Sequence, residues 1–557
     1  MTSKPIRIGG GSAFFIDSAM AVPQLLGAGV DYIILDYLAE GAMGLLGRMR
    51  AADPTSGFPS DFMDVHIGPF LSRISETGTK IIANAGGVNP AGLTAKLRER
   101  IAELGLRVTV AYVAGDDLMG QDWPDLPKGL TSVNAYLGAF PIAAALRQRA
   151  DIVITGRVVD SALALGPLIH EFGWEPTDFA KLAGGTVVGH LIECGAQVTG
   201  GTFTDWREVD GWANIGSPIA ECFEDGSCII TKPEGTGGLV SFGTVAEQML
   251  YEVGDPQAYF VPDVTVDFST VTLEEIGRDR VRVAGATGYP PTDMLKVCAT
   301  YDDGWRGIAY QPIIGPSAAE KASKQAAALF ERGSAMLGAR GMADWRRSAL
   351  VLIGGGEEAI AKLIVEHDDA AGAGMFVREQ FAAISAMAPG TSVSFGVQVQ
   401  PCMGLVSFLV PKAEVQATVD GMVFVGKDVG GFDAGMIVRP AVPSARQRGE
   451  ACVRSVADLA YTRSGEKGET INVAVIARQT DYLPALRATL SPQALQNRFA
   501  DLGEFEVTIF EVPGIHALNI VLAGALPGGI NASQRLDPAA KGIGQRLLGM
   551  GVDSSLG

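Results

Sequence analysis

The sequence predicts an α/β fold: a doubly wound, mainly parallel sheet with an α+β elaboration, followed by a small ferredoxin-like α+β domain. Three observations predict it. In roughly the first 160 residues, short apolar runs rich in β-branched side chains alternate with helix-like stretches, as in strand–helix–strand units. These runs are continuously apolar, as strands covered on both faces are. The end of the chain instead orders strand, helices, strand, strand and helix, which suits a small two-layer domain.

The strands of the parallel sheet are expected in five runs. Helix-like sequence follows the first two runs, as DSAMAVPQLLGAG and EGAMGLLGRMR. The runs are PIRIGGG, VDYIILD, KIIANAG, RVTVAYVAG and ADIVITG, which begin at residues 5, 30, 80, 107 and 150.

The pattern of apolar runs alternating with helix-like stretches ends near residue 200. Shorter β-like pieces follow, namely SCIITK, GLVSFGTV, VTVDFSTV and RVRVAGATG. Residues 317–347 predict a helix, and SALVLIGGGEEAIAKLI predicts a strand, a glycine turn and a helix. A bridge containing Pro, Arg and Ser near 439–468 indicates a domain boundary. We therefore expect an α/β domain over 1–450, with its sheet core in 1–200 and the elaboration in 201–450, and a ferredoxin-like domain over 463–557.

Composition narrows the class of protein. The 557 residues carry a net charge of −18 and a mean hydropathy of +0.22, which argues against nucleic acid or an anionic membrane as partner. No apolar run approaches the ~18 residues of a membrane span, and the start lacks a signal-peptide pattern, so we expect a cytoplasmic protein. Six scattered cysteines without a CxxC pair indicate reduced thiols.

Polar residues and glycines follow each predicted strand. In an open α/β sheet the ligand crevice lies outside the carboxyl ends of the strands, so these residues are expected to share one cleft. A single turn residue at a strand end has a purely structural explanation, but five coincident ends favour a site. The strand-end candidates are Gly10, Gly11, Asp36, Glu40, Asn84, Gly86, Asp116, Arg157 and Asp160.

The segment AGGTVVGHLIECGAQVTGG places reactive side chains among glycines. If it is helical, His190, Glu193, Cys194 and Gln197 share one face. His190 and Glu193 are candidates for acid/base chemistry, with plain packing as the competing interpretation. A metal at His190, Glu193 and Asp205 and a nucleophilic Cys194 are weaker alternatives, because HxxE alone occurs often by chance.

Nucleotide motifs give little support for a nicotinamide or P-loop function. IRIGGGSAFF reads GGGS rather than GxGxxG, and GK[ST] is absent from the chain. Basic residues beside glycine turns are instead candidates for binding an anionic ligand: Lys232 in KPEGTGG, Arg463 and Lys467 in RSGEKG, and the late Lys541. Solvated surface charges are the competing interpretation for each of them.

Several stretches together carry a family resemblance over nearly the whole chain. They include IGGGSAFFIDS, LDYLAEGAM, NAGGVNP, NAYLGAFPI, GHLIECGAQVTGGTFTDW, KPEGTGG, EQMLYEVGDPQAYFVPDV and RSGEKGETINVAVIAR. On them the chain resembles the acyclic terpene utilisation AtuA family, with its C-terminal ferredoxin-like domain. Glu466 stands where that family usually has Asp, a change that keeps the charge.

The resemblance implies a bacterial, cytoplasmic, catabolic protein linked to breakdown of citronellol- or geraniol-like compounds, in pathways that work on acyl-CoA thioesters. We expect an enzyme that acts on a branched or aromatic acyl-CoA or carboxylic acid by acid/base chemistry, as a hydratase, lyase or isomerase, without a cofactor or metal, and as a homo-oligomer. The alternatives are a non-catalytic binding or assembly subunit that docks through its C-terminal domain, and a metal-dependent hydrolase. The expected catalytic residues are Asp36, Asp116, Asp160, His190 and Glu193, and the expected substrate-binding residues are Gly10, Gly11, Asn84, Gly86, Arg157, Lys232, Arg463 and Lys467.

Overall fold

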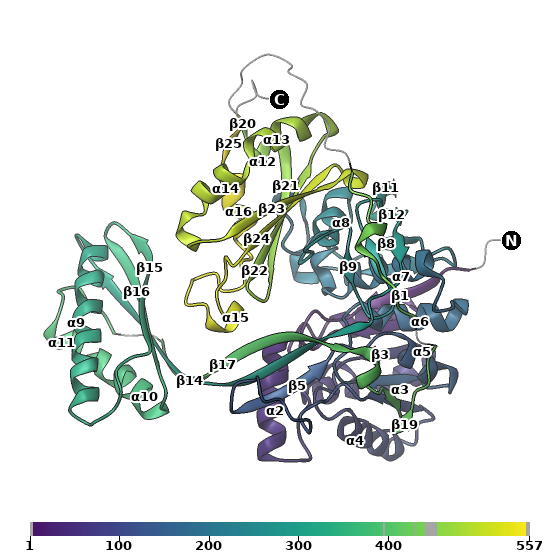
Figure 1. The fold of residues 1–557 in the computed structure, drawn as a ribbon, viewed down its shortest axis with the longest axis horizontal. Coiled ribbons are helices and arrows are strands. Elements are labelled where there is room, and N and C mark those ends of the chain that lie inside the picture. The colour runs from purple at the N-terminus through teal and green to yellow at the C-terminus, as the bar shows by residue number, and fades with distance from the viewer. Residues whose placement is uncertain (1–3, 394–395, 428, 441–453, 553–557) are drawn as a thin grey trace.

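A computed structural model describes residues 4–393, 396–427, 429–440 and 454–552. Figure 1 shows three parts: an N-terminal unit built on a large sheet, a lobe that projects from it on two long strands, and a C-terminal domain packed against the N-terminal unit. Much of the bridge at 439–468 lies outside the described residues, as does the boundary at residue 450. Position 463, expected to open the C-terminal domain, falls within a strand of that domain.

The N-terminal sheet has a parallel centre, as expected. Its five strands run in the order β1-β2-β3-β6-β4 with parallel pairing throughout. Their carboxyl ends therefore meet at one edge, where the polar strand-end residues come together. The strands are β1 (Ile6–Gly10), β2 (Tyr32–Leu35), β3 (Lys80–Ala83), β6 (Ile152–Thr155) and β4 (Val110–Ala114).

Helices cover both faces of this sheet, which confirms the doubly wound arrangement. Ile33 of β2 packs in the core with α1, α3 and α4, and the next residue, Ile34, packs on the other face with α5, α6 and α7. Asn89 caps α4 by accepting a hydrogen bond from the Gly92 amide, and Pro90 fits the first helical position. The helices are α1 (Ala21–Ala28), α2 (Glu40–Ala52), α3 (Leu71–Thr77), α4 (Pro90–Glu103), α5 (Phe140–Arg147), α6 (Ala162–Phe172) and α7 (Phe179–Ile192).

Antiparallel strands extend the sheet on both sides, so the whole sheet is mixed. β7, β8, β12 and β11 follow β1 on one side, and β18 and β19 follow β4 on the other. GLVSFGTV, expected as a strand, instead leads into helix α8, whose capping box at Ser241 fixes its start. The added elements are β7 (Ile219–Cys222), β8 (Cys228–Thr231), α8 (Phe242–Met249), β11 (Thr272–Gly277), β12 (Arg280–Ala284), β18 (Thr418–Val419) and β19 (Met422–Val423), with a separate small sheet of β9 (Tyr259–Phe260), β10 (Thr265–Asp267) and β13 (Thr287–Tyr289).

The projecting lobe belongs to a five-stranded antiparallel sheet in the order β15-β16-β14-β17, with β5 paired to β14 outside this order, and its helices cover one face. The segment EEAIAKLI, expected as a helix, is a strand of this sheet. Its Ala, Glu, Lys and Leu residues favour helix intrinsically. From Glu358 on, however, it belongs to β16, whose ten residues all pair with β14 and whose alternate side chains pack on α9. The elements are β5 (Leu130–Ala135), β14 (Met294–Ile314), α9 (Ala318–Gly338), β15 (Arg347–Gly355), β16 (Glu358–His367), α10 (Ala370–Glu379), α11 (Ala383–Ala386) and β17 (Gly396–Pro411).

The C-terminal domain is an antiparallel sheet in the order β21-β22-β24-β23. Its β22 alternates strictly: Val473 and Val475 face the domain's own helices, whereas Ala474 and Ile476 join the core of the N-terminal unit. RSGEKG, expected as a linker loop, forms the end of β21 and the turn that follows. The elements are β20 (Arg454–Ser455), α12 (Val456–Leu459), β21 (Ala460–Lys467), β22 (Thr470–Ala477), α13 (Leu483–Thr489), α14 (Pro492–Arg498), β23 (Glu506–Val512), β24 (Ala517–Ala523), α15 (Gly529–Ala532), α16 (Ile543–Leu548) and β25 (Gly551–Val552).

No helix within the described ranges is both long enough and apolar enough to cross a membrane.

Candidate functional site

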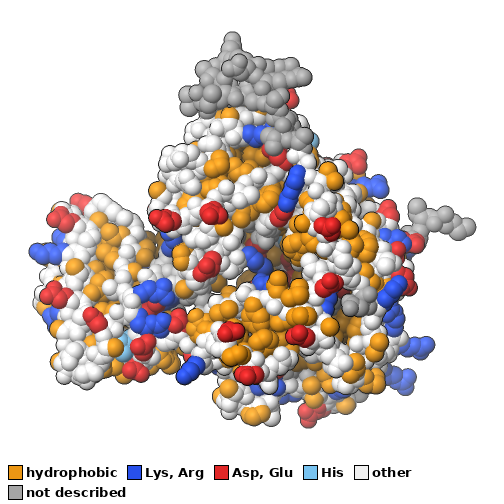
Figure 2. Space-filling view, in the orientation of Figure 1, with side chains coloured by type: hydrophobic (Ala, Val, Ile, Leu, Met, Phe, Trp, Pro, Cys, Tyr) orange, Lys and Arg blue, Asp and Glu red, His pale blue; other side chains and the backbone are white. Residues whose placement is uncertain are grey.

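A cluster of charged side chains lies at the carboxyl ends of the parallel strands, beside the C-terminal domain. The surface is hollowed between the two units, and Lys, Arg and acidic side chains show inside the hollow (Figure 2). We call the following set the central cluster: Asp36, Glu40, Arg157, Asp160, Glu193, Glu252 and Lys467.

Asp36 follows β2 and is held by Asn84, which follows β3. The Asn84 side-chain amide donates to Asp36 Oδ1 at 2.6 Å, and the Asn84 carbonyl oxygen accepts from the Tyr37 backbone amide. Burial raises the pKa of Asp36 well above its usual range, with the charges of Asp160 and Glu193 acting in the same direction. These effects favour the protonated form of the Asp36 carboxyl. Asn84 orients this carboxyl, and its expected contact with a substrate stays a prediction.

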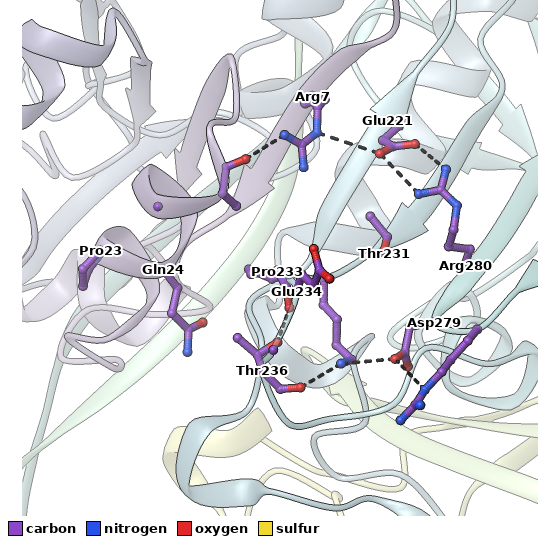
Figure 3. A pocket seen from close by; sticks show the side chains of 15 residues that line it. Arg7, Pro23, Gln24, Glu221, Thr231, Pro233, Glu234, Thr236, Asp279 and Arg280 are labelled. Atoms are coloured by element: carbon purple, nitrogen blue, oxygen red, sulfur yellow. Dashed lines mark hydrogen bonds and ion pairs between the residues drawn. The ribbon is translucent and has the colours of Figure 1, made fainter.

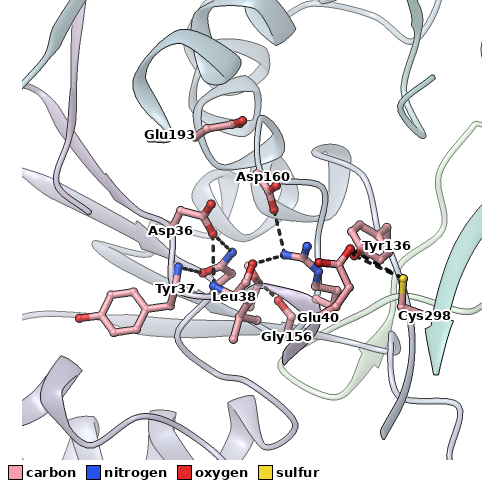
Figure 4. A network of polar contacts seen from close by, with 12 residues as sticks. Asp36, Tyr37, Leu38, Glu40, Tyr136, Gly156, Asp160, Glu193 and Cys298 are labelled. Atoms are coloured by element: carbon pink, nitrogen blue, oxygen red, sulfur yellow. Dashed lines mark hydrogen bonds and ion pairs between the residues drawn. The ribbon is translucent and has the colours of Figure 1, made fainter. Parts of the chain in front are cut away.

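Arg157 follows β6 and is the buried cation of the cluster, with 2% of its surface exposed. One guanidinium nitrogen donates to Asp160 Oδ1 and to the Leu38 carbonyl, both at 2.8 Å. The guanidinium also lies 4.2 Å from the centre of the Tyr136 ring. Figure 4 shows Asp36, Glu40, Asp160 and Glu193 around this network. Among the described residues, Arg157 Nε has no hydrogen-bond partner, which leaves a buried donor for a ligand.

Glu40 begins α2 and lies on the opposite side of Arg157. Its Oε1 accepts from the Tyr136 hydroxyl at 2.7 Å and lies 3.4 Å from Lys296 Nζ. Burial acts to raise the pKa of Glu40, but Lys467, Lys296 and Arg157 together hold that pKa well below its usual range. Glu40 is thus ionised, in contrast with Asp36. Neighbouring carboxyls with pKa values pushed apart are a mark of acid/base sites.

His190 and Glu193 form a pair at the end of α7. The helix stops at Ile192, so Cys194 and Gln197 leave the shared face expected from the sequence and enter a short 3-10 turn. His190 Nε2 donates to the Met249 carbonyl at 3.2 Å, and His190 Nδ1 lies 3.3 Å from Glu193 Oε1. Since a carbonyl only accepts, Nε2 carries a proton, and a second proton can lie between Nδ1 and Glu193.

Of this pair, Glu193 is the residue whose charge acts on Asp36 of the central cluster. Burial raises the pKa of Glu193, and the hydrogen bond and charge of His190 oppose that rise. Its Oε2 atom is buried without a partner among the described residues. His190 itself packs edge-on against Phe268, so the packing interpretation of this histidine also holds.

Lys467 enters the cluster from the C-terminal domain, at the end of β21. Its ammonium lies 3.5 Å from Glu252 Oε2, and 47% of the side chain is exposed. Loss of hydration by itself would lower the pKa of Lys467. The negative charges of Glu252, Glu40 and Asp160 outweigh this effect and raise that pKa well above its usual range. Burial and the charges of Glu252 and Glu40 raise the pKa of the preceding Glu466 to about 7.

Several members of the site carry no recognisable sequence pattern. Tyr136, Lys296 and Glu252 lie in stretches whose pattern reads as ordinary strand or loop, and Glu40 was noted only as one strand-end residue among many. Lys541 was expected in an anion pocket with Arg463 and Lys467. It lies 3.0 Å from Glu252 Oε1 and contacts the Tyr251 hydroxyl.

Other expected site residues have structural partners instead. Asp116 Oδ2 accepts from the Arg157 backbone amide and from the Asn134 side chain, both at 2.8 Å, so it holds the end of β6. Burial raises the pKa of Asp116 to about 7. The amides of Gly10, Gly11 and Gly86 donate to the carbonyls of Pro218, Ile34 and Thr155, respectively. They are therefore not free to hold a substrate carbonyl.

Lys232 lies in a different pocket from the central cluster. This Lys232 pocket has a volume of about 1070 Å³ and is lined by residues of β1, α1, β7, β8 and the β11–β12 turn. Lys232 Nζ donates to the Thr236 carbonyl at 3.0 Å and pairs with Asp279 at 3.3 Å, while Arg7 and Arg280 both face Glu221 (Figure 3). Arg463 also stands apart from Lys232, because it contacts Gln197 and Thr202 and covers the Tyr251 ring. The expected single anion pocket is thus divided.

The metal-site alternative lacks its third residue. Asp205 forms a two-point ion pair with Arg478 at 2.5 and 2.6 Å, which joins the N-terminal unit to the C-terminal domain. No group of three His, Cys, Asp or Glu side chains in the part of the chain that the structure describes is arranged to hold a metal ion. Burial and the nearby Glu193 raise the pKa of the Cys194 thiol well above its usual range, which disfavours a thiolate nucleophile.

Comparison with known families agrees with this architecture. Residues 6–421 match the family described as acyclic terpene utilisation family protein AtuA, and residues 454–553 match the AtuA ferredoxin-like domain. The chain belongs to the AtuA family. This membership indicates a role in acyclic terpene utilisation. A search of curated proteins found no match.

Proposed function

We propose that this AtuA-family protein is a catabolic enzyme that moves protons on a branched or aromatic acyl-CoA or carboxylic acid, as a hydratase, lyase or isomerase. The observation that carries the proposal is the position of two buried carboxyls with raised pKa values, Asp36 and Glu193, in one charged cluster with the buried cation Arg157. A protonated carboxyl beside a fixed cation can donate a proton while the cation stabilises the negative charge that develops on a carbonyl oxygen.

The proposed roles follow from the contacts. Glu193 and His190 exchange the proton that lies between them with the carbon next to the substrate carbonyl. Asp36, held by Asn84, donates to the departing or arriving oxygen. Arg157 Nε holds the substrate carbonyl, because Nε is a buried donor without a partner in the described chain. Glu40 stays ionised and fixes Tyr136 and Lys296.

The first experiment asks which ligand class binds. Thermal unfolding is measured with CoA, geranyl-CoA, isovaleryl-CoA and benzoyl-CoA, beside the corresponding free acids. A ligand at about 100 times its Kd stabilises the native state by about 2.7 kcal/mol. A rise in Tm with thioesters and not with free acids supports the thioester class, and no rise with any of them would contradict the proposal.

The second experiment measures whether the protein removes a proton from the bound ligand. For a ligand that binds, NMR in D₂O measures exchange of the hydrogen on the carbon next to the carbonyl. Glu193→Gln and Asp36→Asn are expected to slow exchange or turnover by about 10²–10⁴-fold. Lys232→Met is the matched control, since its pocket is separate. Equal rates in all four proteins would argue for the non-catalytic alternative.

An assembly role for the C-terminal domain is less well supported. The face of that domain with Ala474 and Ile476 is already buried against the N-terminal unit of the same chain. It supplies Lys467 to the central cluster, as a domain that completes a site would.

A further inference from the structure

The turn after α8 holds a glutamate in an unusual backbone conformation. Glu252 has a φ of +58°, in the left-handed region that side chains longer than Asn or Asp rarely adopt. Residues held in this way persist only where their surroundings determine them, and they gather at functional sites. What holds Glu252 is therefore informative.

Two buried asparagines of the C-terminal domain hold this turn. Asn472 on β22 accepts from the Glu252 amide at 2.8 Å and donates to the Leu250 carbonyl at 2.8 Å. Asn519 on β24 donates to the carbonyls of Val253 and Gly254 at 2.8 and 2.6 Å. Both asparagines are at most 4% exposed on strands that are otherwise apolar. Their hydrogen bonds are used to fix a turn of the N-terminal unit.

This clamp places the Glu252 carboxylate between two lysines of the C-terminal domain. Oε1 lies 3.0 Å from Lys541 Nζ and Oε2 lies 3.5 Å from Lys467 Nζ. Gly465 allows this close approach, because a Cβ there would meet the Tyr251 ring and the Glu252 side chain. Both lysine side chains are nearly half exposed, so a ligand can reach the ammonium groups.

We propose that Lys467 and Lys541 form a binding site for a free carboxylate group of the substrate, and that Glu252 occupies this site until the ligand displaces it. The inference rests on the proposed function and narrows its substrate class to acyl compounds that carry a second, free carboxylate. A carboxylate is favoured over a phosphate because the group that already bridges the two lysines is a carboxylate.

The electrostatics of Glu252 are suited to displacement. Burial raises the pKa of Glu252, and Glu40 and Asp160 act in the same direction, against Lys467. The charges of Glu40 and Asp160 thus repel the Glu252 carboxylate, whereas Lys467 attracts it. Because the clamp acts on the backbone, the side chain can turn away while the turn stays in place.

Calorimetric titration of the full chain with 3-methylglutarate, its monomethyl ester and isovalerate tests the proposal. We expect 3-methylglutarate to bind more tightly than either monoanion. Glu252→Gln removes the competing charge and should tighten binding of 3-methylglutarate about tenfold. Lys541→Met and Lys467→Met should each weaken it about tenfold. A purely structural Glu252 would give weaker or unchanged binding in Glu252→Gln.

Matched controls use the exposed pair of Lys181 and Asp178 on and beside α7, which lie 3.9 Å apart. Lys181→Met and Asp178→Asn should leave binding unchanged. Lys541→Arg, which keeps the charge, guards against a folding defect and should bind within about threefold of the unmodified protein. Absence of 3-methylglutarate binding in both the unmodified protein and Glu252→Gln would overturn the inference. In that case, thioester binding and proton exchange would still support the proposed function. Conversely, if the protein bound 3-methylglutarate but neither bound thioesters nor exchanged the proton, only the proposed function would be overturned.

Discussion

The central cluster and the Lys232 pocket both gather lysine, arginine and carboxylate side chains, but they pair them differently. In the Lys232 pocket two carboxylates each lie between two cations: Glu221 faces Arg7 and Arg280, and Asp279 faces Lys232 and Arg278. In the central cluster several carboxyls share two cations, and burial raises the pKa of Asp36 and of Glu193. A cluster of charged side chains is a candidate acid/base site when burial shifts the pKa values of its members, rather than when each charge simply forms a surface ion pair.

The largest difference between the two regions is expected in the free energy of unfolding when one cation is removed from each. Arg157→Met would leave Asp160 without its ion-pair partner, and loss of one partner of a buried pair costs about 3–5 kcal/mol. Arg280→Met in the Lys232 pocket removes a partly exposed ion pair, for which about 1 kcal/mol or less is expected. Urea unfolding of both variants measures the difference. Equal losses would show that the two regions are not distinct.

Neutralising a carboxyl should separate the regions by activity. Asp36→Asn keeps an oxygen that can accept from Asn84, so the fold should persist while turnover falls about 10²–10⁴-fold. Asp279→Asn in the Lys232 pocket should change turnover less than about threefold. Steady-state rates on the thioester that binds, with circular dichroism as the folding control, decide between these outcomes. A comparable fall in both variants would count against Asp36 as the proton donor.

The pH dependence of stability sharpens the same contrast. The folded-state pKa values of Asp116 and Glu466 are raised to about 7, chiefly by burial. The native state therefore binds more protons than the unfolded state between about pH 4 and pH 7, and the free energy of unfolding should fall as pH rises through this range. Stability from these groups is fully present below about pH 4 and lost above pH 7.

Asp116→Asn checks this sign. The variant should show a shallower fall in the free energy of unfolding between pH 5 and pH 8 than the unmodified protein, measured by urea titration at each pH. Asp178→Asn, on the surface, should leave the slope unchanged. An unchanged slope in Asp116→Asn would mean that the Asp116 carboxyl is already ionised in the folded protein over this range.

The smallest effect is expected at Cys194. Because burial and the nearby carboxylates keep its thiol protonated, Cys194→Ala should retain turnover within about threefold. Iodoacetamide should modify Cys194 slowly at pH 7, as peptide mass spectrometry can follow. Rapid alkylation with parallel loss of turnover would restore the nucleophile alternative.

The strand ends were readable from the sequence for a simple reason. Strands buried on both faces must be apolar along their length, so a polar residue such as Asp36 or Arg157 marks the point where a strand leaves the core. Parallel pairing then brings those ends to one edge. The same logic could not separate Asp36 from Asp116, because both follow strands and only their hydrogen-bond partners distinguish them.

The secondary structure beyond the parallel core was less readable. EEAIAKLI has helix-favouring residues, yet pairing with β14 makes it a strand, because ladder hydrogen bonds and packing outweigh small intrinsic preferences. RSGEKG has the composition of a loop but pairs with β22 up to Lys467. The strand that it pairs with, β22, is brought beside it only when the C-terminal domain folds.

The sequence by itself determined the family, the doubly wound core and the edge of the sheet at which Asp36, Asn84, Arg157 and Asp160 meet, because burial and strand direction follow from local patterns. Only the tertiary structure decided that Lys467, from the C-terminal domain, reaches the same edge and that Lys232 does not. It also decided the left-handed turn at Glu252, which depends on Asn472 and Asn519 more than two hundred residues away along the chain. Charges interact through space, and the distances between them are fixed only when the domains pack.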